Sequence, residues 1–271
     1  MEYLLLLLLG CLVGTFGTLV GVGGGFILVP VLLMLYPDES PGYITSVSLV
    51  VVFFNSLSGS VAYSRMKRID YKTGLMFALA AIPGSVLGPL TVEYIPRKLF
   101  NIIFSIIIIT VAFFLFFRKN NETANQKEVG IIAKGSTLRN LTDAEGNNYI
   151  FSFNRSTGII LSIFISYVSS IIGVGGGIFY VPAMLSILNF PLNIATATSQ
   201  FILSFMTLGS SIVHFTSGNL RHGFFFILLL SAGAVLGAQI GAKISKRLKG
   251  KLIIRCLAVA MGLAGLKILL G

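Results

Sequence analysis

Long runs of apolar residues alternate with short polar stretches along the whole chain. A helix that crosses a bilayer core of about 30 Å needs roughly 20 mostly apolar residues, and most of these runs approach or exceed that length. The pattern therefore predicts an all-α polytopic membrane protein. The expected segments cover about 3–19, 26–36, 43–64, 73–94 and 99–117 in the first half, and about 157–172, 178–188, 194–217, 223–242 and 252–270 in the second.

Glycines interrupt the apolar pattern at two matching places. The sequence Gly-Val-Gly-Gly-Gly occupies positions 21–25 and recurs at 173–177, and each copy is followed by an apolar stretch that contains a proline, Pro30 or Pro182. Such a break inside an apolar run frees amide groups that only protein, water or a bound solute can satisfy. Two breaks at corresponding places in two halves point to the binding site of a transporter.

The two halves correspond beyond these glycines. Three blocks recur in the same order at nearly constant separation, which indicates an internal duplication. The matching pairs are Thr45 with Thr196, Ser48 with Ser199, Tyr63 with His214, and Gly84…Gly88 with Gly233…Gly237.

The distribution of positive charge predicts how the repeats are oriented. If each broken run doubles back, the basic stretches 65–72, 118–155 and 243–251 all face the cytoplasm, as the positive-inside rule requires. If each broken run crosses once, the cluster at 243–251 faces outside. We therefore predict two inverted repeats of about five hydrophobic segments each, with Gly-broken helical hairpins that meet near the midplane and with both termini outside.

The predicted organisation has three parts. Residues 1–117 form a first transmembrane repeat, 118–155 a cytoplasmic polar linker or small insertion, and 156–271 a second transmembrane repeat. For the middle part, a flexible linker is the default, and a β-structured insertion that pairs 129–134 with 149–153 is the alternative. The first apolar run lacks a basic n-region, so we expect a membrane segment rather than a cleaved signal.

Composition supports the membrane class and narrows the partners. The chain is 55% hydrophobic and 11% charged, against about 25% charged in soluble domains. Its net charge of +11 arises from basic residues in short loops, a pattern that sets topology and argues against a nucleic-acid partner. Cys11 and Cys256 lie in apolar runs without a metal-binding motif, so we predict packing roles, no metal and no cofactor.

The glycine breaks suggest anion chemistry. The helices that begin near Phe26 and Ile178 present unpaired N–H groups and a partial positive charge, which favour anions. In inverted repeats these two helix starts approach the midplane from opposite sides and form an oxyanion site made largely of backbone amides. The alternative is that the glycines only allow close helix packing. A P-loop is excluded because neither copy has the required Lys and Ser/Thr.

Side chains that follow each break complete the predicted site. Hydroxyls and amides can donate hydrogen bonds to an oxyanion without adding a charge, although they can also bond to their own helix or a neighbour. Asn55 is a weaker candidate on the same run. The predicted substrate-binding residues are Gly21, Gly23, Gly24, Gly25, Gly173, Gly175, Gly176, Gly177, Thr45, Ser48, Thr196, Thr198, Ser199 and Gln200.

Titratable groups inside the apolar runs are few. His214 could carry a coupling proton, or it could lie at the membrane interface because it is close to the end of its run. No Ser–His–Asp arrangement or metal-ligand spacing occurs in the sequence, so we do not expect an enzyme.

The paired G-x-G-G-G…P segments, the Thr/Ser-bearing run after each, and the Gly84 and Gly233 blocks resemble the sulfite exporter TauE/SafE family of membrane transporters. The resemblance covers essentially the whole chain except 118–155, which is longer and more polar than the family's short linker. It implies transport of sulfur-containing anions, such as sulfite and organosulfonates, across the cytoplasmic membrane, generally outward.

The overall prediction is a multi-pass secondary transporter of the cell membrane that exports such anions by alternating access, driven by the proton gradient. Its expected partners are a small anion and the lipid bilayer, with a possible homodimer. The alternatives are a passive anion channel on the same fold, and a non-transporting membrane subunit that recruits a partner through 118–155.

Overall fold

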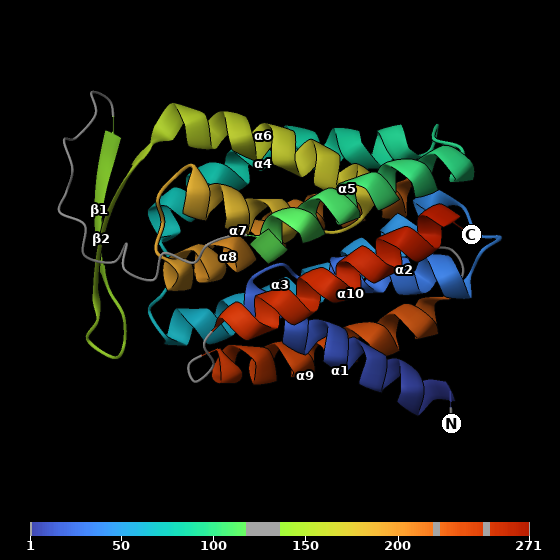
Figure 1. Cartoon of the computed structure of the whole chain (residues 1–271), viewed down its shortest axis with the longest axis horizontal. Coiled ribbons are helices and arrows are strands. Elements are labelled where there is room, and N and C mark those ends of the chain that lie inside the picture. Colours follow the sequence, from blue (N-terminus) through green and yellow to red (C-terminus); the bar gives the residue numbers. More distant parts are fainter. Residues whose placement is uncertain (1, 118–135, 219–222, 246–249, 271) are drawn as a thin grey trace.

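The computed structural model describes residues 2–117, 136–218, 223–245 and 250–270, and it consists of a helical bundle with a β-hairpin at one end (Figure 1). The predicted segments are confirmed as helices, with ends within a few residues of those expected. In the first half they are α1 (Glu2–Val20), α2 (Gly25–Leu35), α3 (Pro41–Arg65), α4 (Tyr71–Val92) and α5 (Arg97–Phe117). In the second half they are α6 (Arg155–Ile172), α7 (Gly177–Ser186), α8 (Leu192–Thr216), α9 (Phe224–Ile244) and α10 (Gly250–Leu270).

The helices carry the features of a membrane protein. Five of those described are long and apolar enough to cross a bilayer: Tyr3–Val20, Pro41–Arg65, Tyr71–Val92, Arg155–Ile172 and Phe224–Ile244. Large apolar side chains such as Leu79 and Phe164 are well exposed on the outer surface of the bundle, at 59% and 65%. Contact of these side chains with lipid costs no free energy, whereas their exposure to water would be unfavourable.

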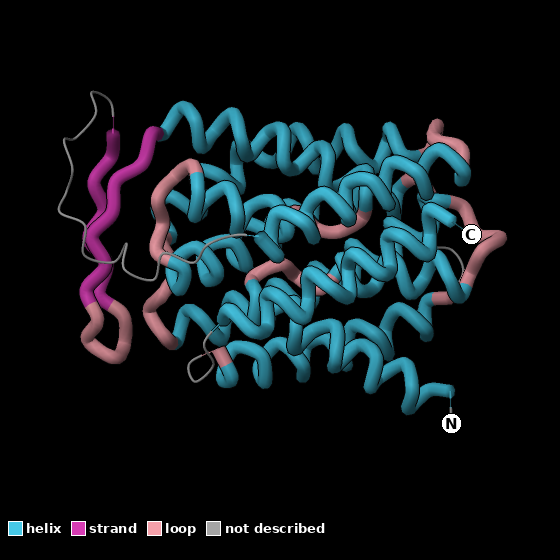
Figure 2. The backbone as a smooth tube through the Cα atoms, viewed as in Figure 1, coloured by secondary structure: helices cyan, strands magenta, loops and turns pink. Residues whose placement is uncertain are grey.

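The broken runs double back inside the bundle. Both termini lie at the end opposite the β-hairpin (Figure 1). From that end α1 runs to the middle of the bundle and α2 returns, whereas α6 enters from the hairpin end and α7 returns to it. Figure 2 shows the two glycine breaks as loops in the interior of the bundle.

Helices of the two halves interlock rather than form separate bodies. The first helix of each half packs against the fourth helix of the other half, so α1 lies on α9 and α6 lies on α4. The matching glycines permit these contacts, because a Cβ at Gly237 would overlap the Cys11 backbone and one at Gly88 would overlap the Ser170 side chain. The other large helix interfaces, α3 with α8, α5 with α10, α3 with α9 and α4 with α8, also join the two halves.

A β-hairpin replaces much of the expected linker. Strands β1 (Ser136–Thr142) and β2 (Asn148–Asn154) pair antiparallel, with Thr137 opposite Phe153 and Leu141 opposite Tyr149. The predicted pairing of 149–153 with 129–134 is therefore wrong, since 149–153 pairs with 137–141; residues 129–134 themselves lie outside the described part. The turn between the strands is stabilised by the Asp143 carboxylate, which accepts from the backbone N–H groups of Glu145 and Asn147.

The hairpin contacts helix ends from both halves. The Phe151 ring packs 4.4 Å from Phe190, which lies between α7 and α8, while Phe153 lies 5.2 Å from the same ring. On the other side, the Arg68 guanidinium between α3 and α4 pairs with Asp143 at 3.4 Å, and both side chains are almost fully buried. The hairpin thus joins two loops that are far apart in sequence.

Candidate functional site

The two glycine breaks have the same backbone conformation. Three glycines in each break have φ between 76° and 87°, in the left-handed region where a side chain is strained. They are Gly21, Gly23 and Gly24 in the first break, and Gly173, Gly175 and Gly176 in the second. This shared conformation turns the chain sharply between α1 and α2 and between α6 and α7.

Each break starts a new helix without a side-chain cap. Gly24 and Gly176 are the N-cap residues of α2 and α7, and neither helix start receives a side-chain hydrogen bond. The first N–H groups of such a helix have no partner within the helix itself and are open to another acceptor. Unpartnered N–H groups at a helix start are the kind of group that binds anions, so the anion site expected from the sequence stays a prediction.

The two helix starts meet in the interior. Gly25 packs against the backbone of Val174, and in the matching contact Gly177 packs against the backbone of Val22. Val52 of α3 lies beside both breaks, because a Cβ on Gly23 or Gly175 would come within 2.8 Å or 2.5 Å of its Cγ1 atom. We call this meeting of residues 21–25 and 173–177 the glycine crossing.

Two serines bind the crossing in matching fashion. The Ser48 hydroxyl donates to the carbonyl oxygen of Gly173 at 2.7 Å, and the Ser199 hydroxyl donates to that of Gly21 at 2.9 Å. Each serine thus holds the break of the opposite half. The sequence shows that a serine follows each glycine break in both halves. It does not show that each serine bonds to the break of the other half.

The threonines of the predicted site also have protein contacts. The Thr45 side chain lies against Gly173 and donates to its own helix at Pro41, 2.9 Å away, whereas Thr196 lies against Gly21. The Thr198 hydroxyl accepts from the backbone N–H of Asp70 at 3.1 Å, at the hairpin end of the bundle. Thr45 and Thr196 therefore border the crossing, and Thr198 does not.

Gln200 belongs to a small group of buried polar residues on the hairpin side of the crossing. Its amide nitrogen donates to the carbonyl oxygen of Gly17 at 3.1 Å, and its side-chain oxygen lies next to Gly59. There the Thr18 hydroxyl donates to the side-chain oxygen of Asn55 at 3.1 Å. We call Thr18, Asn55, Gly59 and Gln200 the amide cluster. Sequence reasoning missed Thr18, whose signal is a polar residue near the end of an apolar run.

His214 is buried inside the bundle, two residues before the end of α8, so its role in proton coupling and its depth in the membrane stay predictions. Its side chain is 0% exposed within α8. The matching residue, Tyr63, is also buried and donates from its hydroxyl to the carbonyl oxygen of Thr18 at 2.9 Å. Within the described residues, no group of three or more His, Cys, Asp and Glu side chains could hold a metal ion.

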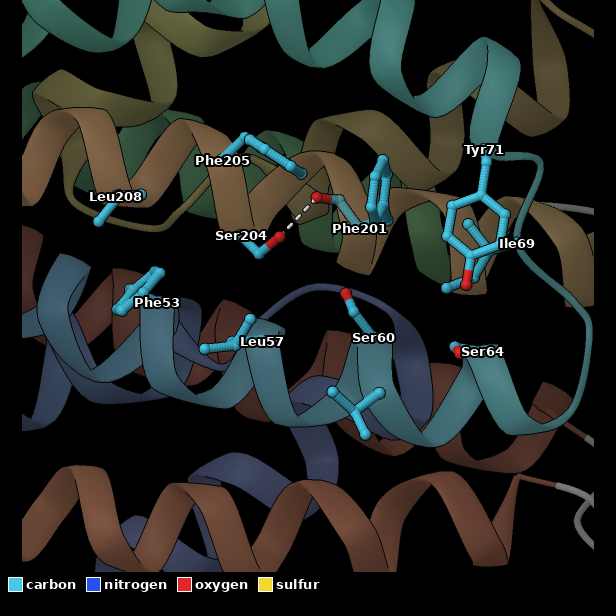
Figure 3. Close-up of a pocket in the computed structure, with 11 residues that line it drawn as sticks. Phe53, Leu57, Ser60, Ser64, Ile69, Tyr71, Phe201, Ser204, Phe205 and Leu208 are labelled. Carbon is cyan, nitrogen blue, oxygen red and sulfur yellow. Dashed lines mark hydrogen bonds between the residues drawn. The ribbon is translucent and has the colours of Figure 1, made fainter.

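A groove of about 350 Å³ runs between α3 and α8 beside the crossing (Figure 3). Phe53 of α3 lines it directly after Val52, which contacts both glycine breaks. Ser60 of α3 and Ser204 of α8 line the groove from facing helices, and aromatic and aliphatic side chains make up most of the rest. The lining contains no charged side chain, so any charge recognition must come from dipoles and hydrogen bonds.

Broken helix hairpins that meet inside a multi-pass helical bundle define the class of membrane transporters with discontinuous helices. The family model "Sulfite exporter TauE/SafE" matches residues 6–268, and the chain belongs to this family. It is 31% identical to the probable membrane transporter protein YunE of Bacillus subtilis, over 99% of this chain and 98% of that protein. It is 25% identical to a probable membrane transporter protein of Methanocaldococcus jannaschii, over 99% and 97% of the two chains.

No solved structure matches the chain. The two relatives span nearly the same length as this chain. The protein is thus a multi-pass membrane transporter of the cell membrane that handles a small substrate within a lipid bilayer.

Proposed function

We propose that the protein exports small sulfur-containing anions, such as sulfite or short organosulfonates, by alternating access. The observation that carries the proposal is the meeting of two uncapped helix starts at Gly25 and Gly177 in the bundle interior. A helix N-terminus stabilises a nearby anion by about 0.3–1 kcal/mol at a surface and by more where water is excluded. The substrate class rests on membership of the sulfite exporter family.

The packing supports a particular form of alternating access. Helices α1, α3 and α9 pack together, α4, α6 and α8 pack together, and the two groups meet along α3 and α8. We infer that relative movement of these two groups along the α3–α8 interface exposes the crossing to one side of the membrane at a time. Inverted repeats supply the two equivalent states, and the paired bonds from Ser48 and Ser199 are consistent with them.

Proton coupling is assigned to His214. One helical turn before it, the Ser210 hydroxyl lies 2.9 Å from that of Ser170, which belongs to the helix that leads into the second break. This buried polar chain lies on the far side of the crossing from the amide cluster and could relay a proton. Replacing His214 with Gln should abolish the acceleration of flux by a pH gradient while substrate binding persists.

The test is uptake of labelled sulfite and of a two-carbon sulfonate by proteoliposomes, with and without an imposed pH gradient. Saturable flux that the gradient accelerates is the expected result. Saturable flux that ignores the gradient would remove the proton from the mechanism. Flux that neither saturates nor responds to the gradient would identify a passive anion channel, and no flux of either anion would overturn the substrate assignment.

Two further expectations are tested in the same preparation. Deletion of the hairpin strands should leave measurable flux, because we propose that the membrane helices carry transport. If the wild-type protein shows no flux and the deletion abolishes binding of a partner protein, the chain would instead be a non-transporting subunit. A homodimer, which we propose because symmetric oligomers are commonly twofold, is tested by the mass of the purified protein after subtraction of bound detergent.

A further inference from the structure

The amide cluster breaks the correspondence between the two halves. Around the crossing, most contacts of one half have an equivalent in the other half. However, the alignment that pairs Thr45 with Thr196 pairs Asn55 with Met206 and Leu49 with Gln200. All four side chains are 0% exposed. One side of the crossing therefore buries two amides where the other side buries two apolar side chains of similar size.

Each amide has one hydrogen-bonding atom that bonds to nothing in the described part of the chain. The side-chain oxygen of Asn55 accepts from Thr18, and the side-chain nitrogen of Gln200 donates to Gly17. The Asn55 nitrogen and the Gln200 oxygen find no partner among the described residues. A buried polar group without a partner costs free energy, and the other half shows that an apolar side chain fits each place.

Gly59 packs closely against the Thr18 hydroxyl and the Gln200 side-chain oxygen. A Cβ at this position would lie 3.1 Å from the Thr18 hydroxyl oxygen and 3.2 Å from the Gln200 side-chain oxygen, closer than ordinary contact. Glycine is not required there by the backbone, which is helical. Its lack of a side chain instead lets Thr18 and Gln200 pack closely against α3 without a clash.

On α3, Asn55 and Gly59 follow Val52, which lies beside both breaks, toward the hairpin end of the bundle. On α8, Gln200 lies between Ser199, which bonds to Gly21, and Leu203, which lies beside Gly23. The basic loop at 65–72 lies at the same end, which is the cytoplasmic end under the positive-inside rule. An exporter takes up its substrate from this side.

We propose that Asn55 and Gln200 form a one-sided subsite that selects an oxyanion carrying one acidic hydrogen, hydrogensulfite, over a fully ionised sulfonate. The Asn55 nitrogen donates to an S–O oxygen, and the Gln200 oxygen accepts from the S–OH group. A sulfonate has only acceptor oxygens and leaves the Gln200 oxygen without a partner. This inference rests on the proposed transport of sulfur anions and specifies which protonation state the protein binds.

The test replaces each amide with the residue that the other half carries. In N55M and Q200L, KM for sulfite should rise by about tenfold, which corresponds to about 1.4 kcal/mol of binding free energy, while the maximal rate changes little. For the two-carbon sulfonate, Q200L should change KM much less than for sulfite. Gly59→Ala crowds the Thr18 hydroxyl and the Gln200 side-chain oxygen without removing a polar atom and should also raise KM for sulfite.

The matched control is Phe54→Met, a substitution at a lipid-facing position of the same helix. All variants are compared at equal yield of monodisperse protein, and sulfite-induced thermal stabilisation in detergent gives a second readout of binding. Unchanged KM for sulfite in N55M and Q200L would overturn the subsite while the transport function stands, because a structural water would then satisfy the amides.

Failure of the proposed function gives a different result. If the wild-type protein moves no sulfur anion, thermal stabilisation decides the subsite on its own. Stabilisation by sulfite at acidic pH that N55M and Q200L abolish would retain the subsite, and no stabilisation of the wild type by sulfite would overturn it.

Discussion

Glycines at the crossing combine a backbone requirement with a lack of space. Gly23 and Gly175 have positive φ, and a Cβ on either would also collide with Val52. Gly146 in the hairpin turn has the same kind of backbone, with φ of 85°, yet a Cβ there would meet nothing within 4 Å. These three glycines therefore separate backbone strain from crowding.

We expect G23A and G175A to reduce flux by at least about tenfold, whereas G146A stays near wild type. The left-handed backbone costs an alanine about 1–2 kcal/mol in all three variants, but only the two at the crossing also displace Val52 between the breaks. Initial rates in proteoliposomes measure the effect. Adding Val52→Ala to G175A should restore part of the flux, and an equal loss in G175A and G146A would contradict a specific role for the crossing.

The serine bonds across the halves give a second prediction for single residues. Ser48→Ala and Ser199→Ala each leave a buried glycine carbonyl without its hydroxyl donor, which should cost about 1–3 kcal/mol of stability. The control is Ser46→Ala on α3, because the Ser46 hydroxyl donates within its own helix, to the carbonyl oxygen of Tyr43. Melting temperatures in detergent measure the difference. A loss in Ser46→Ala as large as that in Ser48→Ala would show that the cross-half bond adds nothing.

Among the elements, the β-hairpin contains a carboxylate, Asp143, whose pKa is shifted by burial, by its hydrogen bonds and by a nearby charge. Burial alone would raise the pKa of Asp143, but hydrogen bonds from the side chain and backbone of Asn147 and the backbone of Glu145, together with the charge of Arg68, hold that pKa below its ordinary value. Because the folded pKa is lowered, the carboxylate stabilises the fold at neutral pH. This contribution is lost as pH falls through the folded pKa.

We therefore expect D143N to melt below the wild type at pH 7, by an amount that corresponds to about 2 kcal/mol. The difference should shrink as pH falls below about 3.9, the ordinary value for an aspartate, because the wild-type carboxylate then becomes neutral as well. Asp38→Asn, at an exposed loop position of the other end, is the control. A difference that stays constant with pH would assign the effect of D143N to packing instead of charge.

At the scale of the whole molecule, the large helix–helix interfaces join one half of the chain to the other. The first helix of each half packs on the fourth helix of the other, and the hairpin joins loops from both. Movement during transport must therefore divide the protein into units that mix both halves.

The inverted arrangement predicts the sidedness of two matched loops. In a background without Cys11 and Cys256, Asp38→Cys between α2 and α3 should react with an impermeant maleimide from outside intact cells. Asn189→Cys in the corresponding loop between α7 and α8 should react only from the cytoplasmic side. Both positions are exposed. Labelling of both cysteines from one side would indicate parallel repeats and would overturn the inverted topology.

The sequence predicted the elements well because a membrane imposes a simple pattern on them. A bilayer requires long apolar helices with satisfied backbones, so hydropathy alone locates them to within a few residues. The glycine breaks and their duplication were equally visible, because four glycines in five positions strongly disfavour a continuous helix. The strand pairing was not predicted correctly, because the register of a hairpin is set by its turn, which here is held by the hydrogen bonds that Asp143 accepts from Glu145 and Asn147.

By itself, the sequence determined the membrane class, the family, the helices and the matching glycine breaks, all of which are encoded locally along the chain. Only the tertiary structure showed which groups each buried polar side chain contacts, and in which half of the chain they lie. It bonds Ser48 and Ser199 to opposite breaks, buries His214, and gathers Thr18, Asn55 and Gln200 around Gly59. These contacts join residues far apart in sequence, and no local pattern specifies them because they exist only when the two halves interlock.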